Sequence, residues 1–64
     1  MPPYSSPEAR LTALLICEGP LTFRKIIAAH EARSWPTSEL RATMTAMLRA
    51  NVIGENREIE YYLK

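Results

Sequence analysis

The first third of the chain carries apolar residues at the spacing of an amphipathic helix. Three leucines share one helical face at i, i+3 and i+4: Leu11, Leu14 and Leu15. Pro7 suits the first turn of a helix, where a backbone N–H has no partner to lose, and Gly19 followed by proline ends it. The pattern therefore predicts a helix over residues 7–18. Ser5 and Ser6 are both suitable N-caps, and the sequence leaves the choice between them open.

Two further segments repeat the helical period. Their apolar faces consist of Phe23, Ile26, Ile27 and His30 in the first, and of Leu40, Met44, Met47 and Leu48 in the second. Thr22 is a suitable N-cap for a helix over residues 23–32. After a connector that contains a proline, either Thr37 or Ser38 can cap a third helix over residues 38–50.

The pattern changes from helical to alternating near the C-terminus. Asn51 tolerates the left-handed conformation that ends a helix, and a turn-rich stretch follows it. Ile59, Tyr61 and Leu63 then alternate with polar or outward-facing residues. This predicts a two-stranded hairpin over residues 52–63, whose apolar face packs on the helices because an isolated hairpin is only marginally stable.

The predicted fold is mainly α with a small β-hairpin. Three helices and one hairpin over residues 7–64 make a single domain, and 64 residues leave no room for a second one. Residues 1–6 contain two prolines in succession, which do not propagate a helix, so this stretch is expected to be an N-terminal arm.

Several short stretches also match a known family. They are Gly19-Pro20-Leu21-Thr22, Ile26-Ile27, Leu40 with Met44, Met47-Leu48, Asn51-Val52-Ile53 and Tyr61-Tyr62-Leu63. In these residues and in the order of its elements, the chain resembles winged-helix transcriptional regulators of bacteria, archaea and phages, over about residues 7–64. The resemblance implies a three-helix winged helix-turn-helix fold, a third helix that reads DNA and a wing formed by the hairpin.

The sequence departs from the family pattern at three points. His30 occupies a position where a buried aliphatic residue is usual, and Asn51 replaces the usual glycine before the wing. The wing tip carries one cation, Arg57, between Glu55 and Glu58. A glutamate-rich wing opposes phosphate contact, so any contact there is expected from Arg57 alone.

Composition and charge narrow the function classes. A chain of 64 residues completes its core with little surplus for an active-site cleft, and no catalytic constellation can be assembled, so the protein is not expected to be an enzyme. One cysteine, one histidine and no aspartate leave no disulfide, metal site or cofactor to expect. The net charge of +1 means that a nucleic-acid contact must rest on local geometry. No apolar run is long enough for a membrane span, no signal peptide is recognisable and no small-molecule ligand is evident, so a cytoplasmic location is expected.

The third predicted helix offers the candidate DNA-reading surface. Its outer face carries Ser38, Ala42, Thr45 and Arg49, with Arg41 on one flank and Glu39 and Ala46 on the other. Small side chains let a helix sink into the major groove, where threonine or alanine contacts thymine methyl groups and arginine binds guanine. The same face also suits close approach of a protein partner. The sequence therefore favours double-stranded DNA as the partner, with a non-enzymatic protein-interaction module as the alternative.

The first predicted helix is apolar on a second side. This side carries Ala9, Ala13, Ile16 and Cys17. One interpretation is a homodimer interface, which would let a small protein reach two half-sites on DNA. The other is that the N-terminal arm or the C-terminal strand covers this side, and the sequence does not decide between them.

Three residues with potential chemistry are interpreted as structural. His30 is expected to be a hydrogen-bonded core residue, because no second metal ligand is visible. Cys17, next to Ile16 in a helix, is expected to be a small buried apolar residue. Trp35, in the connector before the third helix, is expected to pack as a lid on the core.

Overall fold

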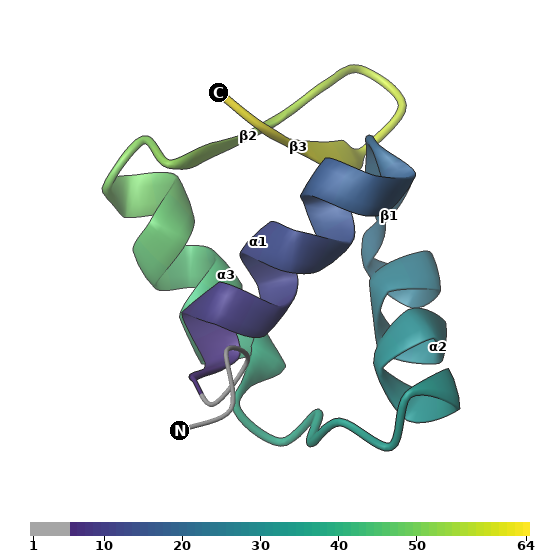
Figure 1. Ribbon diagram of the computed structural model, residues 1–64. Coiled ribbons are helices and arrows are strands. Elements are labelled where there is room, and N and C mark those ends of the chain that lie inside the picture. The colour runs from purple at the N-terminus through teal and green to yellow at the C-terminus, as the bar shows by residue number, and fades with distance from the viewer. Residues whose placement is uncertain (1–5) are drawn as a thin grey trace.

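The computed structural model describes residues 6–64, so the predicted arm over residues 1–6 lies outside it except for Ser6. Within that range the chain forms three helices and a three-stranded antiparallel sheet (Figure 1), a mainly α architecture with a small β part. The elements are, in chain order, α1 (Pro7–Glu18), β1 (Leu21–Thr22), α2 (Phe23–Ala32), α3 (Leu40–Arg49), β2 (Ile53–Glu55) and β3 (Glu60–Leu63). None of these helices combines the length and apolar character needed to cross a membrane.

The first two helices begin and end where their sequence signals predict. Ser6 is the N-cap of α1, and its hydroxyl oxygen accepts a hydrogen bond from the Ala9 N–H at 3.1 Å, which settles the choice between the two serines. Gly19 follows α1 with a φ of 78°, a conformation that glycine adopts without strain. Thr22 caps α2 in the same way, by accepting from the Lys25 N–H at 3.3 Å.

The third helix begins later than the sequence predicts. It starts at Leu40 rather than residue 38, and neither Thr37 nor Ser38 caps it with its side chain. Instead the Thr37 carbonyl accepts from the Leu40 N–H at 3.1 Å, which turns the backbone tightly just before the helix. At the other end Asn51 has a φ of 61°, as predicted for a left-handed stop.

The sheet contains one strand more than the predicted hairpin. Its strand order is β1-β3-β2, so the C-terminal strand β3 lies in the centre and pairs with both neighbours. Leu21 of β1 lies opposite Tyr61, and Ile53 of β2 lies opposite Leu63. The short segment between α1 and α2 therefore anchors the hairpin to the helices.

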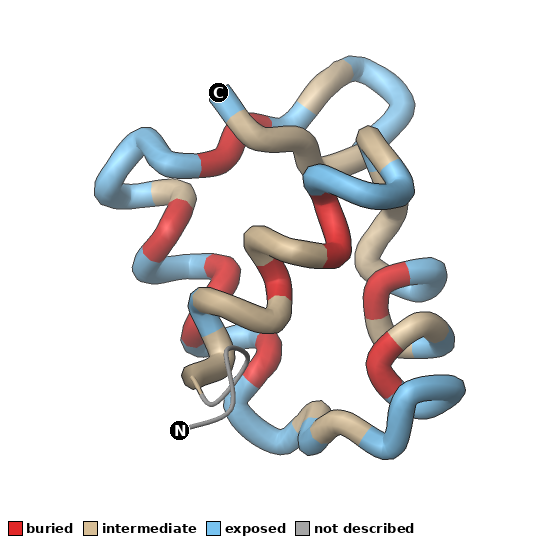
Figure 2. Tube along the Cα trace, viewed as in Figure 1, coloured by how far each residue is buried: buried red, intermediate tan, exposed pale blue. Residues whose placement is uncertain are grey.

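The core lies between the helices and the sheet. α1 contacts α2, α3 and β3, and Figure 2 shows that the buried positions of each helix turn toward this centre. Thr43 is also buried, although it lies beside the apolar stripe predicted for α3. The buried apolar side chains are Leu11, Leu14, Leu15, Ile26, Leu40, Met44, Met47 and Ile53, with Tyr61 and Leu63 packed against them.

Ile59 does not face the helices as its alternating pattern predicts. It lies in the loop between β2 and β3, its exposed fraction is 62%, and its φ of 60° is in the left-handed region. The side chain of Asn56 organises this loop, because its Oδ1 accepts from the N–H groups of Glu58 and Glu60 at 3.0 and 2.9 Å. The turn therefore takes Ile59 out of the strand, and β3 begins one residue later.

Replacing Ile59 by glycine should stabilise the protein. A β-branched residue in the left-handed region is strained by roughly 1–2 kcal/mol, and glycine removes that strain at an entropy cost of about 0.5–1 kcal/mol. We expect a net gain of about 0.5–1 kcal/mol and, for a domain this small, a melting temperature roughly 2–8 °C higher. Ile59→Val keeps the β-branch and is the matched control, so an equal shift in both thermal melts would contradict this explanation.

His30 is a core residue, as the sequence indicates. It is 1% exposed, and its Nδ1 lies 2.9 Å from the Ile26 carbonyl oxygen, to which it donates as a neutral imidazole. Trp35 packs edge-on against the His30 ring at a centroid distance of 5.3 Å, as expected for a lid on the core. Burial lowers the pKa of His30 below its ordinary value, and the positive charges of Arg10 and Arg33 lower it further against the opposing effect of the Ile26 hydrogen bond.

The stability of the protein should therefore fall in mild acid. Because the folded-state pKa of His30 lies below the unfolded value of 6.5, the unfolded chain binds the proton more readily. The free energy of unfolding should decline as the pH falls from 6.5 toward the folded-state pKa, and should be insensitive to this group above that range. Denaturant titrations at pH values from about 7.5 to about 5, the range in which histidine side chains titrate, measure how the free energy of unfolding depends on pH. His30→Asn keeps a side-chain N–H donor but does not titrate, so an identical slope in this variant would contradict the assignment.

Candidate functional site

The outer face of α3 is open to solvent along the length of the helix. Ala42, Thr45 and Arg49 are all exposed, whereas Met44 and Met47 on the opposite face are buried. Ser38, which the sequence places in this helix, is exposed but lies in the turn before it. The structure thus brings together on one surface the residues predicted for α3, with Ser38 as an extension rather than a helical position.

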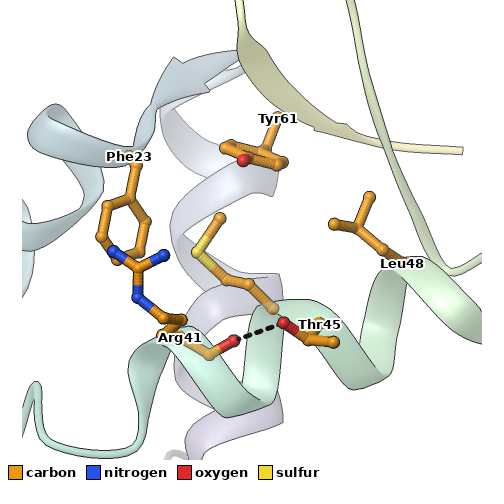
Figure 3. A pocket seen from close by; sticks show the side chains of 6 residues that line it. Phe23, Arg41, Thr45, Leu48 and Tyr61 are labelled. Atoms are coloured by element: carbon orange, nitrogen blue, oxygen red, sulfur yellow. Dashed lines mark hydrogen bonds between the residues drawn. The ribbon is translucent and has the colours of Figure 1, made fainter.

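Arg41 lies on the flank of this surface and packs against α2. Its guanidinium carbon is 5.0 Å from the centroid of the Phe23 ring, close enough for a cation–π contact (Figure 3). Phe23 is the first residue of α2, so the contact joins the first turns of α2 and α3. No sequence pattern indicates this contact, because Phe23 and Arg41 are far apart along the chain and meet only in the fold.

Thr45 presents its methyl group with its hydroxyl proton already engaged. Its Oγ1 donates to the Arg41 carbonyl oxygen at 3.0 Å, one turn back along α3. Ala42 and Ala46 flank it on the exposed surface. The middle of the face therefore offers methyl groups, and Arg41 and Arg49 lie toward its two ends. Glu39, the N-cap of α3, is also exposed at the same end as Arg41.

Two exposed cations outside the predicted site lie in the first turn of α2. Arg24 and Lys25 follow Phe23 in the first turn of α2, and both are exposed. Because the Phe23 ring contacts the Arg41 guanidinium, the first turn of α2 adjoins the start of α3. Together with Arg49, four of the chain's eight lysines and arginines thus belong to α3 and the adjoining turn of α2.

Arg57 lies at the tip of the β2–β3 hairpin. It is exposed in the loop that Asn56 organises, at the opposite end of the hairpin from the turn that leads out of α3 (Figure 1).

On the outer side of the same hairpin, Gly54 lies under the Tyr62 side chain. A Cβ at Gly54 would lie 2.7 Å from the Tyr62 hydroxyl oxygen, so a larger residue here would have to displace the side chains of Tyr62 and Lys64.

The second apolar side of α1 is only partly covered. Ile16 is 68% exposed and Cys17 is exposed, so the expectation that Cys17 is buried is wrong. Ala9 and Ala13 are half-buried. A shallow depression of about 140 Å³ connects α1 with the α2–α3 connector, and it is lined by Ala13, Leu14, Cys17, Arg33 and Trp35.

The segment between α2 and α3 lies beside Cys17 and forms one wall of this depression. Arg33 bridges the elements, since its Nη2 lies 3.6 Å from a carboxylate oxygen of Glu18 and its Nη1 donates to the Ala29 carbonyl oxygen. The guanidinium carbon of Arg33 also lies 5.4 Å from the centroid of the Trp35 ring. The described part of the chain leaves Ile16, near the end of α1, mostly exposed.

The described residues form no metal-binding cluster and enclose the histidine. Residues 6–64 contain no group of three His, Cys, Asp or Glu side chains that could hold a metal ion. The histidine is neutral and enclosed, and its ring nitrogen is engaged with the backbone. What the fold exposes instead is a helix face of small side chains with arginines at its ends.

Comparisons with known proteins do not identify the chain. No protein-family model matches it, and neither does any curated protein sequence or solved structure. The functional interpretation therefore rests on the residues and geometry described above.

Proposed function

We propose that this chain is a winged helix-turn-helix DNA-binding protein, a small transcriptional regulator whose α3 enters the major groove. The single observation that carries the proposal is the uninterrupted exposed face of α3, which is small in the middle and cationic at its ends. A helix with such a face can approach the floor of the groove closely, because no long side chain holds its backbone away. In this scheme β2 and β3 form the wing.

The side chains of α3 suggest how sequence would be read. The methyl groups of Ala42 and Thr45 suit contact with thymine methyl groups, while Arg49 can donate two hydrogen bonds to guanine O6 and N7. Arg41 is held against Phe23, so it is placed for the edge of the groove rather than its floor. Arg24 and Lys25 supply charge for the phosphate backbone beside it.

The wing contributes less to this scheme than the helix. Arg57 is the only cation in the loop between β2 and β3, and Glu55 and Glu58 lie close to it in sequence. A single phosphate contact by Arg57 would add one counterion-release increment to the salt dependence of binding. The hairpin is therefore proposed to be structural first and a DNA contact second.

A homodimer through α1 would complete the recognition of a two-fold site. Ile16 is a large apolar side chain exposed at 68%, and it lies on the side of α1 that also carries Ala9, Ala13 and Cys17. Two copies related by two-fold symmetry could bury this side against each other. The dimer is part of the proposal and has its own test.

Ile16→Glu should yield a folded monomer that binds DNA more weakly. The side chain is exposed in the single chain, so the substitution leaves the core intact, whereas a buried unpaired carboxylate would disfavour the dimer by several kcal/mol, roughly 3–5. Sedimentation velocity over a wide concentration range measures the change, with Glu8→Gln as a control on the same helix. A wild-type chain that sediments as a monomer at every concentration would contradict the dimer.

The alternative is a protein-interaction module without enzymatic activity. The observation that favours it is the exposure of Ala42 and Ala46, which would permit close packing of a partner helix on α3. The two functions differ in their dependence on salt, because DNA binding releases counterions and protein contact through alanines does not.

A salt titration of binding to a random-sequence duplex separates the two functions. Fluorescence anisotropy with a labelled duplex should show affinity that falls linearly with the logarithm of salt concentration, with a slope set by the phosphate contacts. For four to six contacts the slope in log units should be about −4 to −5. Absence of binding even at low salt would favour the protein-interaction module instead.

A further inference from the structure

A pocket opens beside the proposed DNA-reading face, between the first turn of α2, one side of α3 and the central strand β3. Its volume is about 280 Å³, and it opens to solvent. Figure 3 shows the Arg41 guanidinium and the Phe23 ring on one side, with the Tyr61 ring facing the pocket from β3. The lining residues are Phe23, Arg41, Met44, Thr45, Leu48 and Tyr61.

The chemistry of the lining is that of an apolar pocket with one cation. Phe23 and Tyr61 supply aromatic surfaces, and Met44 forms part of a floor that is continuous with the core. Among residues 6–64, Arg41 forms no ion pair with a carboxylate. A guanidinium in contact with an aromatic ring still keeps N–H donors available for a ligand.

We propose that this pocket binds a small aromatic carboxylate. The aromatic ring of the ligand would lie between Phe23 and Tyr61, and its carboxylate would accept hydrogen bonds from Arg41. Arginine suits this role because its planar fork matches the two oxygens of a carboxylate. The proposed DNA contact does not enter this argument, so the inference stands or falls independently of it.

The size of the pocket limits the ligand to one or two fused rings. Pockets for drug-sized molecules measure roughly 300–1,000 Å³, and a volume of about 280 Å³ lies just below that range. A nucleotide or a dinucleotide cofactor is too large for it. The pocket is assembled from three elements that are distant along the chain, which is why no sequence motif indicates it.

Indole-3-acetate and its neutral amide, indole-3-acetamide, make a matched pair of probes. The two molecules share a ring system and differ in the charge that Arg41 would recognise. We expect titration with indole-3-acetate to shift the NMR signals of the Met44 and Leu48 methyl groups. A charge-assisted hydrogen bond should make the carboxylate bind roughly tenfold more tightly than the amide.

Variants of two arginines on α3 complete the test. Arg41→Gln should remove the preference for the carboxylate, so that both probes bind with the low affinity of the amide. Arg49→Gln removes an exposed cation of the same helix that does not line the pocket, and should leave the tenfold preference intact. Equal affinities of the two probes for the unmodified protein would overturn the proposal, as would an unchanged preference in Arg41→Gln or shifts confined to residues outside the pocket.

Discussion

A chain that ends at Ile59, and so lacks residues 60–64, should be unfolded at room temperature. The truncation removes the central strand of the sheet, which pairs with both β1 and β2. It also removes Tyr61 and Leu63, which pack on the core and would each contribute up to about 1.5–3 kcal/mol if fully buried. The total stability of so small a domain is on the order of 5 kcal/mol. The loss should therefore exceed what the remaining contacts can offset.

Circular dichroism and thermal melts measure this loss directly. Lys64→Ala is the matched control, because it keeps the backbone N–H that donates to the Val52 carbonyl oxygen and removes only an exposed side chain that donates to the Asn51 side chain. The control should melt within a few degrees of the full chain, since an exposed substitution costs roughly 0.5 kcal/mol or less. A cooperative melt of the longer truncation near the wild-type temperature would show that the sheet is an appendage to the helices.

Replacing Arg49 or Arg41 by alanine should weaken DNA binding without unfolding the chain. Both side chains are exposed, so their removal leaves the core untouched. Loss of a bidentate guanine contact by Arg49 should cost about 1–3 kcal/mol, or roughly 5- to 150-fold in affinity, and relax specificity at one position. Arg41, at the edge of the groove, should show a smaller loss that is more uniform across sequences.

Anisotropy titrations against a duplex selected from a random library measure both effects. Arg57→Ala is the comparison variant, because one wing-tip phosphate contact should cost little and reduce the salt slope by about one unit. Thermal melts of all three variants establish that each is folded. Affinities for the selected duplex that are unchanged in both Arg49→Ala and Arg41→Ala would exclude α3 as the reading element.

Local signals predicted those parts of the fold that depend on neighbouring residues. Ser6, Gly19 and Thr22 act on the backbone within a few residues of their own positions, so α1 and α2 have the bounds that the sequence predicts. The start of α3 was misplaced because the Thr37 carbonyl, and not a side chain, makes the turn before it. A carbonyl is common to every residue, so no sequence signal distinguishes it.

Contacts between distant segments were harder to predict. β1 is two residues long and pairs with a strand near the other end of the chain, which leaves no periodic pattern to detect. The alternating pattern includes Ile59, but this residue lies in a turn, because Asn56 Oδ1 accepts hydrogen bonds from the N–H groups of Glu58 and Glu60 on either side of it. Cys17 lies near the end of α1, where the connector only partly covers the helix and leaves the thiol exposed.

In the candidate site, too, features that depend on one helix could be predicted and contacts between distant segments could not. Helical periodicity predicted which residues of α3 face solvent, because that depends only on the helix and on the position of the core. It did not predict that Phe23 holds Arg41, or that the Thr45 hydroxyl turns back to the Arg41 carbonyl. These contacts decide which groups of the face are available to a partner.

The central claim is that the outer face of α3 contacts DNA, and NMR mapping with duplex DNA tests it most directly. Titration of the labelled protein with a duplex at low salt should shift the backbone signals of Ala42, Thr45 and Arg49, and also those of Arg24 and Lys25. Signals from the outer side of α1, including Ile16, should shift only where two copies of the chain pair on the duplex, so they report the proposed dimer and not the DNA contact. A titration that leaves the α3 signals unchanged, or that shifts only residues of α1, would contradict the account.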